Sequence, residues 1–522
     1  MKYLFCVSFL ILIFTASNFL SAQDTTKSLA FRNNKPQRTT PYFYRPDLAY
    51  QIWQQFTLTQ EANAGDPLAQ HELGLRYLMG EGIPADTLQA IFWIKKAADK
   101  NLTAAKYNYG IMLINGIGVP WNPFSAFKYF KGAANDGMVQ AQYVVGVLYT
   151  DNLVVKRNWN LAYYWIKKSA DGEFKPAAEV IPQLEPRISK SIVDSLFSSK
   201  PGIVSDEDEI INDPKNTKLT SNLGLSFIDF DTITDSAVQI TDSMIIADIE
   251  IMASDSIINK FKTDTSYSLN QISAKTKIDA LIEIANNGSP EAQTILGRMY
   301  EKGIYFRKDE ITAASYYYRA LRNDSPKSTN LLWQLSSKSD FLNQLQSEAK
   351  EGSTEAEFVW YGLVSTGFDR RIDLNDALEM LINSASKNYI PAMIELGLNY
   401  YTGKFLEVDK GKGLNIWQAA ENLGSPEARV RLISSRIFDS IILTDAKKDF
   451  ETLNDLASQG SLLAQVSVAM CYENGIGVNK SRSEAVNYFR IAAQRGSHFA
   501  YEELKRLYDE IRPAESEFII IN

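Results

Sequence analysis

A short sequence pattern recurs along this 522-residue chain in two series, before residue 173 and from residue 288, at steps of 36 residues with one step of 35 and one of 28. The step of 28 runs from Asp324 to Gly352. A repeat of this length accommodates one pair of helices and is too short for a domain, so neighbouring copies must stack to bury a core. The period therefore predicts an all-α solenoid. Copies begin at Gly65, Asn101, Gly137, Gly172, Gly288, Asp324, Gly352, Asn388, Gly424, Gly460 and Gly496.

Small and apolar residues at fixed places predict the first helix of each copy, called helix A. In the first copy these are Ala69, Gly74 and Tyr77, whose spacing puts them on one helical face. Glycine inside a helix costs roughly 1 kcal/mol relative to alanine, so its recurrence suggests a backbone contact that a side chain would block. Gly80 and its equivalents tolerate a left-handed backbone and predict the end of helix A.

A column of capping residues predicts a second helix, called helix B. Eight copies are long enough to contain both helices, and each has Asp, Asn or Ser at position 21 after its start. These residues cap helix N-termini well. The inner face of helix B then repeats alanine and, three places later, an aromatic residue, as in Ala90 and Trp93. The capping column consists of Asp86, Asn122, Asn158, Asp309, Asp373, Asp409, Asp445 and Ser481.

The first copy carries a resemblance to a known family. The run from Ala69 to Ile83, followed by Asp86, Trp93 and Ala97-Ala98, resembles the Sel-one-like repeat, a relative of the tetratricopeptide repeats. The resemblance covers roughly residues 60–185 and 272–510. It implies antiparallel helix pairs stacked into a right-handed superhelix, and protein–protein interaction as an adaptor or scaffold.

Breaks in the register divide the chain into two arrays, of three and about five repeats. A lone helix B over 47–64 should cover the first full pair, and 499–511 should form a final helix A. In the short copy we expect Asp340 to take the capping role and the superhelix to change curvature. The predicted segments are a signal peptide (1–22), a flexible segment (23–46), a first array (47–188), an insert (189–271), a second array (272–511) and a tail (512–522).

The insert between the arrays is acidic. Between Asp194 and Asp264 it has 14 Asp or Glu residues against five Lys. Such composition favours a largely disordered linker. Isoleucines such as Ile245 and Ile246 leave a short helix or docking segment around 235–262 open as an alternative.

The N-terminus predicts export. A lysine and an apolar run from Tyr3 to Phe14 precede small polar residues that lead to Ala22, the layout of a cleaved secretory signal. Cleavage after Ala22 would leave no integral membrane span and a periplasmic or secreted, cell-surface protein. An uncleaved anchor stays open, because Leu20 is larger than the small residue usual at that place.

Charge argues against two classes of partner. Loss of Lys2 with the signal takes the formal net charge from -8 to -9, and no segment is rich in Lys and Arg. Nucleic acid and anionic membranes are therefore poor candidate partners.

The sequence offers little for catalysis. His71 and His498 lie in distant copies without a second His at helical spacing, so no zinc site is expected. Cys471 lies in a helix A on an apolar background, typical of a buried, inert thiol. Members of the capping column are isolated, whereas calcium needs six or more oxygens together. We expect no catalytic residue, no metal site and no cofactor.

A stripe of variable residues on helix A predicts a binding surface. Places seven and eleven of the copies lie four residues apart, on the side away from the alanine face. In the fold that the resemblance implies, helix A lines the concave surface. An ordinary solvated face is the competing interpretation. The predicted partner-binding residues are Glu72, Arg76, Asn108, Glu395, Asn399 and Arg431.

The leading hypothesis is an exported, non-enzymatic scaffold that binds a protein or peptide in its concave groove. One alternative is an envelope enzyme that acts on peptidoglycan or β-lactams, with a carboxylate pair in the groove. Another is a structural spacer between envelope components.

Overall fold

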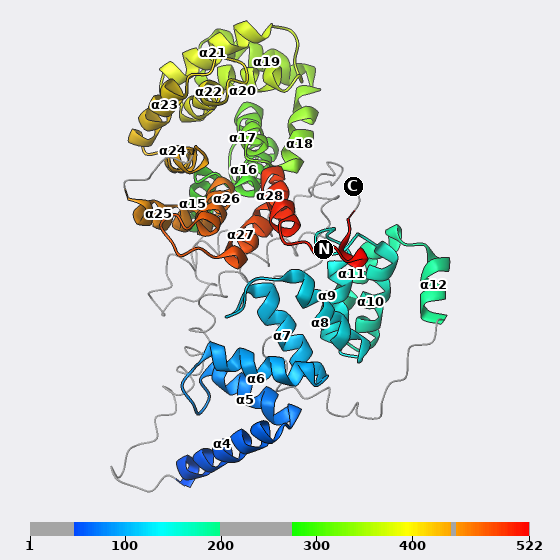
Figure 1. Ribbon diagram of the computed structural model, residues 1–522. Helices are drawn as coiled ribbons and strands as arrows, with labels where there is room; N and C mark the ends of the chain where they lie inside the picture. The colour runs from blue at the N-terminus through cyan, green and yellow to red at the C-terminus, as the bar shows by residue number, and fades with distance from the viewer. Residues whose placement is uncertain (1–45, 199–273, 440–444, 521–522) are drawn as a thin grey trace. The chain divides into compact units, whose positions relative to one another are not determined.

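A computed structural model describes residues 46–198, 274–439 and 445–520. The described chain is an α-solenoid in which antiparallel helix pairs follow one another in chain order, and it contains no strand in those ranges (Figure 1). The predicted signal peptide, the flexible segment before residue 46 and most of the acidic insert, including 235–262, lie outside the described residues.

The capping column has the predicted role in all eight copies. Each member precedes a helix B, and its side chain accepts a hydrogen bond from a backbone N–H of the first turn. Asp86, for example, accepts from the N–H groups of Leu88 and Gln89 at 2.9 and 3.0 Å. Because these oxygens are occupied by helix ends, they are not free ligands for a cation.

Left-handed residues separate the helices as the sequence predicts. The C-caps of five A helices are glycines with φ between 64° and 75°. Asp439, which stands at the place of Gly80 in its copy, differs from expectation and ends its helix at φ -82°. After the third pair the left-handed residue is Glu173, at φ 65°. The five glycine caps are Gly80, Gly116, Gly303, Gly403 and Gly475.

The glycine inside helix A lies against its own helix B, as predicted. A Cβ placed on Gly74 would lie 2.6 Å from Ile94 Cγ1, and one on Gly397 would lie 2.3 Å from Trp417 Nε1. Helices A and B therefore touch closely at this position, where a side chain would force them apart.

A buried glutamine, which the sequence did not predict, links helix A to the preceding helix B in four copies. In four copies a buried glutamine donates from Nε2 to the carbonyl oxygen eight residues earlier, at 2.9–3.3 Å. That carbonyl belongs to the last turn of the previous helix B, where it also accepts from the backbone N–H three residues later. The recurring Ala-Gln dipeptide was its available signal. The four residues are Gln70, Gln142, Gln293 and Gln465.

The first array, with the C-terminal segment, forms one of two compact units, whose described residues are 46–198 and 505–520. It has a lone first helix, three pairs and a terminal group in which the last helix, α12, falls within the predicted insert. The helices are α4 (Pro46–Ala64), α5 (Pro67–Met79), α6 (Thr87–Asp99), α7 (Thr103–Asn115), α8 (Pro123–Asn135), α9 (Val139–Leu148), α10 (Trp159–Asp171), α11 (Lys175–Leu184), η1 (Glu185–Arg187) and α12 (Lys190–Ser198).

The second unit contains the described residues 274–504, so its last helix, α28, belongs to it only as far as Leu504. A lone helix is followed by six pairs, because the short copy also forms a complete pair. The helices are α15 (Ala274–Asn286), α16 (Pro290–Lys302), α17 (Glu310–Arg322), α18 (Pro326–Ser336), α19 (Ser339–Lys350), α20 (Thr354–Ser365), α21 (Leu374–Ser386), α22 (Ile390–Thr402), α23 (Lys410–Asn422), α24 (Pro426–Phe438), α25 (Ala446–Ser458), α26 (Leu462–Asn474), α27 (Arg482–Gln494) and α28 (His498–Asp509). A short η6 (Ser516–Phe518) follows in the C-terminal segment.

The short copy departs from the regular packing. The prediction that Asp340 caps the second helix of this copy is wrong, because α19 begins at Ser339, after Lys338, and Asp340 lies in its first turn. Helix α17 packs directly against α20, with the Tyr318 ring over Gly362. In a regular solenoid each repeat touches only its neighbours. Here the shortened loop lets one helix pass the α18–α19 pair and reach the next copy.

Candidate functional site

Four of the six predicted binding residues are buried. Asn108, Glu395, Asn399 and Arg431 are only 1–8% exposed, whereas Glu72 and Arg76 form an exposed ion pair at 2.9 Å. The accessible part of the stripe is therefore the Glu72–Arg76 pair, and its other four members lie between helices. Its partner-binding role stays a prediction.

Burial of the stripe follows from how successive A helices pack. Asn108 Nδ2 lies 2.7 Å from His71 Nε2 in the preceding copy, and Asn399 Nδ2 donates to the Tyr361 hydroxyl at 2.9 Å. Buried polar groups require such partners. Residues about 36 apart in sequence thus meet across the A–A contact, and sequence spacing alone did not distinguish that contact from solvent.

Glu395 is the centre of a buried polar cluster in the second array. Its carboxylate accepts hydrogen bonds from the Tyr318 hydroxyl at 3.0 Å and from Arg322 Nε at 2.9 Å. Tyr361 and Asn399 complete the cluster at 3.4 Å each. Burial and the Glu395 charge raise the pKa of Tyr318 well above its ordinary value, so this phenol stays protonated. The cluster holds α17 against α22 and offers no free base.

Polar contacts also join the beginning of the second array to its end. Arg495 Nε and Nη2 donate to the two carboxylate oxygens of Glu291 at 2.8 and 2.6 Å. The same guanidinium donates to the carbonyl oxygen of Gly460 and to Gln465. Asn287 Nδ2 donates to Gln459 at 2.8 Å. The second array therefore closes on itself.

The groups most able to do chemistry are poorly placed for it. Burial lowers the pKa of His71 to about 4 and raises the pKa of the Cys471 thiol to about 12, so both are neutral at pH 7. His498 is exposed, 3.8 Å from Glu502. Within the described residues, no group of three His, Cys, Asp or Glu side chains could hold a metal ion.

Half-exposed tyrosines recur where helix A meets helix B. Tyr300 stacks on Tyr316 with ring centroids 5.7 Å apart, and Tyr472 stacks on Tyr488 at the same distance. The guanidinium of Arg319 lies 5.2 Å from the Tyr316 ring centre. Such rings combine apolar area with a polar tip, which suits them to protein contacts. These two tyrosine pairs lie in the first and last helix pairs of the second array.

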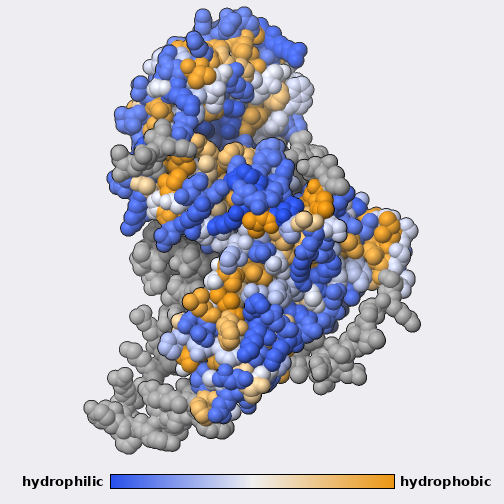
Figure 2. All heavy atoms as spheres, in the orientation of Figure 1, coloured by the Kyte–Doolittle hydropathy of each residue, from blue (hydrophilic) through white to orange (hydrophobic). Residues whose placement is uncertain are grey.

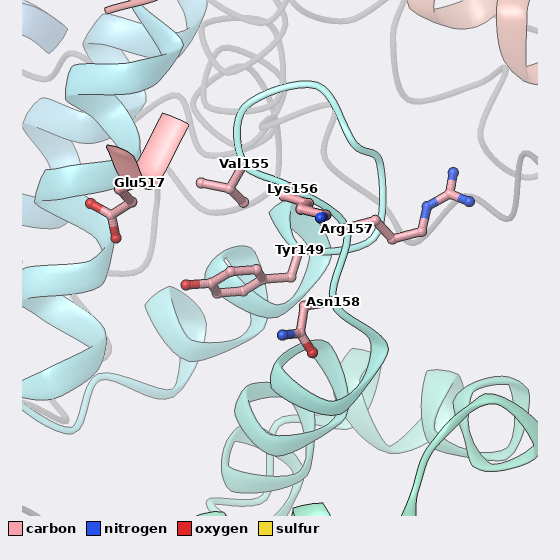
Figure 3. Close-up of a pocket in the computed structure, with 6 residues that line it drawn as sticks. All are labelled: Tyr149, Val155, Lys156, Arg157, Asn158 and Glu517. Carbon is pink, nitrogen blue, oxygen red and sulfur yellow. The ribbon is translucent and has the colours of Figure 1, made fainter. Parts of the chain in front are cut away.

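A depression of about 340 Å³ lies in the first unit beside the C-terminal segment. Figure 3 shows Glu517 on one side and Tyr149, Asn158 and the loop carrying Lys156 on the other. The guanidinium of Arg157 points away from the other residues shown (Figure 3). The lining has no histidine or thiol and therefore no conventional nucleophile–base pair.

Apolar residues are exposed in several separate places. On the face seen in Figure 2, hydrophobic patches alternate with hydrophilic residues over both units. Leu88, Phe92, Tyr305 and Val408 are each more than half exposed. No helix among the described residues is both long enough and apolar enough to cross a membrane.

Comparisons with known proteins agree with the observed helix pairs. Six segments match the Sel1 repeat: 67–102, 103–138, 139–173, 290–325, 390–425 and 462–497. The chain is similar to a solved protective antigen present in uropathogenic Escherichia coli strains that displays an SLR fold, with 19% identity over 88% of this chain and 91% of that chain and a TM-score of 0.30. It is also similar to a Sel1 repeat protein from Oxalobacter formigenes, with 32% identity over 25% of this chain and 98% of that chain and a TM-score of 0.24.

Proposed function

Because the chain belongs to the Sel1-repeat family, we propose that it is an exported, non-catalytic scaffold that holds a protein or peptide partner on the concave face of its solenoid. Sel1 repeats suggest protein–protein interaction in general. The observation that carries the proposal is the two half-exposed tyrosine stacks, Tyr300 with Tyr316 and Tyr472 with Tyr488, in the first and last helix pairs of the second array. Accessible aromatic groups of this kind suit a protein or peptide partner.

The test is capture of a partner by the full chain from an envelope extract at several salt concentrations. We expect one protein at a stoichiometric amount, and less of it with a variant that carries Tyr300→Leu and Tyr316→Leu. Leucine keeps apolar packing but removes the aromatic face and hydroxyl. Lys447→Ala with Glu451→Ala is the matched control, because both side chains are strongly exposed on α25. Absence of any stoichiometric partner contradicts the scaffold.

Export is part of the proposal and has its own measurement. The apolar run before Ala22 supports cleavage after that residue. Intact-mass spectrometry of the protein recovered from the periplasm or the medium should give a chain that begins at Gln23. A chain that retains its first 22 residues would instead indicate an uncleaved anchor.

The enzymatic alternative is tested on the same purified protein. Hydrolysis of muropeptides or of a chromogenic β-lactam would overturn the non-catalytic assignment, whereas unchanged substrates would agree with it. The neutral His71 and the buried Cys471 support that assignment, because neither offers a reactive group at pH 7.

A further inference from the structure

The outer faces of the B helices provide a comparison within the molecule. Positions 23, 26, 27 and 30 of a copy are spaced as i, i+3, i+4 and i+7, so they form one face of helix B. In α25 this face carries Lys447 and Glu451 at positions 23 and 27, whose side chains are 81% and 64% exposed. Positions 23 and 27 of helix B can therefore be charged and exposed to solvent in this repeat.

Helix α8 shows a different solution. Its face has Phe124 and Phe127 beside Lys128 and Lys131, and both rings are buried. The C-terminal segment of the chain covers them, since Phe518 is fully buried with its ring centroid 5.2 Å from Phe124 and 6.0 Å from Phe127. An apolar B-helix face in this array thus receives a short segment with an aromatic anchor.

Charge makes that contact selective. Glu515 pairs with Lys128 at 2.7 Å, and Glu517 pairs with Lys131. The two glutamates are two places apart and precede Phe518, so one short stretch meets both lysines while its aromatic ring enters the apolar half. The face therefore recognises an acidic segment with a phenylalanine anchor.

The next B helix, α10, is covered as well. Tyr164 at position 27 lies 4.9 Å, centroid to centroid, from Phe197 of α12. Asn160 at position 23 accepts a hydrogen bond from the backbone N–H of Ser189 at 2.8 Å. Two of the three B helices in the first array's pairs thus carry another segment of the same chain on this face.

On helix α6 the apolar residues at positions 23 and 27 are uncovered. Leu88 and Phe92 occupy these positions, where α25 has Lys447 and Glu451, and they are 73% and 52% exposed. Ile91 at position 26 is half-buried and lies against Gly118 of the next copy. Lys95 occupies the position of Lys131 and pairs with Asp99 at 2.7 Å, and Lys96 lies 5.3 Å from the Phe92 ring centre. The residues resemble the covered face of α8, while the exposure resembles that of the solvated α25.

We propose that the outer face of α6, formed by Leu88, Ile91, Phe92 and Lys95, docks a short acidic segment of a partner protein that inserts a phenylalanine. The occupant is inferred from the C-terminal segment that α8 binds. Helix α8 belongs to the next copy, and it binds that segment at the same register positions. This proposal rests on the proposed scaffold function and adds a second contact surface to it. The surface lies on helix B and not on the proposed concave face.

The probe is a fluorescent peptide of residues 510–520, titrated against the purified full chain by anisotropy. The chain's own tail holds the α8 face at a local concentration in the millimolar range, so a free peptide competes poorly there. We expect saturable binding that Leu88→Ser with Phe92→Ser weakens about tenfold or more, since both lost contacts are apolar anchors. Both residues are exposed, so the variant should stay folded by circular dichroism.

Two controls make the result decisive. Val408→Ser removes an exposed apolar side chain of the second array and should leave binding unchanged. A peptide with Phe518→Ala should bind about tenfold more weakly or not at all. The proposal is overturned if the peptide shows no saturable binding, or if the α6 variant binds it as the parent does. Failure of the peptide with successful capture from extract would reject this site and leave the scaffold function standing.

Discussion

The two arrays are built from the same helix pair, yet one glutamate in each array stands at the same register position in opposite surroundings. Glu72 and Glu395 both stand seven places after the start of a copy. Glu72 forms an exposed pair with Arg76 in the first array, whereas Glu395 is buried against Arg322 and two tyrosines in the second. The short copy brings α17 next to α20 and α22. Burial at this position does not itself need the short copy, since Asn108 is buried there in the first array; the short copy supplies the charged partner Arg322.

The largest effect should come from removing the buried carboxylate. Glu395→Ala leaves the Arg322 charge and two phenols without their acceptor, which should cost about 3–5 kcal/mol of unfolding free energy. The equivalent change Glu72→Ala should cost less than about 0.5 kcal/mol, because exposed pairs contribute little. Urea unfolding followed by circular dichroism measures both. Equal costs would show that the two positions are not distinct.

Closure of the second array should respond next. Arg495→Met removes four hydrogen bonds, two of them to the Glu291 carboxylate, and should cost about 2–3 kcal/mol. Amide hydrogen exchange should quicken in α15, α16 and α27 and stay unchanged in α5–α10. Lys447→Met on exposed α25 is the control. Unchanged exchange in α15 and α16 would show that the ends are not held together by this residue.

Acid should affect the same contact. Burial alone would raise the pKa of Glu291, but the Arg495 charge and hydrogen bonds outweigh burial and lower it. Its stabilising contribution is therefore complete above the ordinary glutamate value of 4.5 and is lost as the pH falls through the lowered value.

Protonation linked to His71 should lower the unfolding free energy of the first array at a higher pH than protonation of Glu291 lowers that of the second. Burial lowers the pKa of His71 from 6.5 to about 4, so between these values the unfolded chain binds a proton that the folded chain does not. Stability should fall by about 2 kcal/mol from pH 7 to pH 5. His71→Gln should remove this dependence, and Lys447→Met on exposed α25 should not. Urea unfolding at the two pH values gives the comparison, and an identical pH dependence in the parent and His71→Gln would contradict it.

The smallest effect should be equal in the two arrays. Asp86→Ala and Asp409→Ala each remove a helix N-cap and should each cost about 1 kcal/mol. Asp86→Asn, which keeps an acceptor oxygen, should cost only a few tenths. A large difference between the two alanine variants in thermal unfolding would show that the N-cap does not stabilise helix B equally in the two arrays.

The sequence predicted the local parts of the fold well. The capping role of Asp86, the left-handed backbone of Gly80 and the need for a small residue at Gly74 were predicted correctly. Each of them depends only on contacts within one pair of helices. The binding stripe was predicted less well. Asn108 and Glu395 are polar on a helical face, which is equally compatible with water and with a neighbouring A helix, and only their contacts across copies decide between the two.

The period, the caps and the glycine positions of this protein were determined by sequence alone, because they are demands of the backbone over fewer than 40 residues. Which polar residues are buried, how the second array closes and what covers α8 were decided only by the tertiary structure. Arg495 meets Glu291 204 residues away, and Glu517 meets Lys131 386 residues away. Contacts between such distant residues depend on the accumulated geometry of every intervening repeat, which no short pattern records.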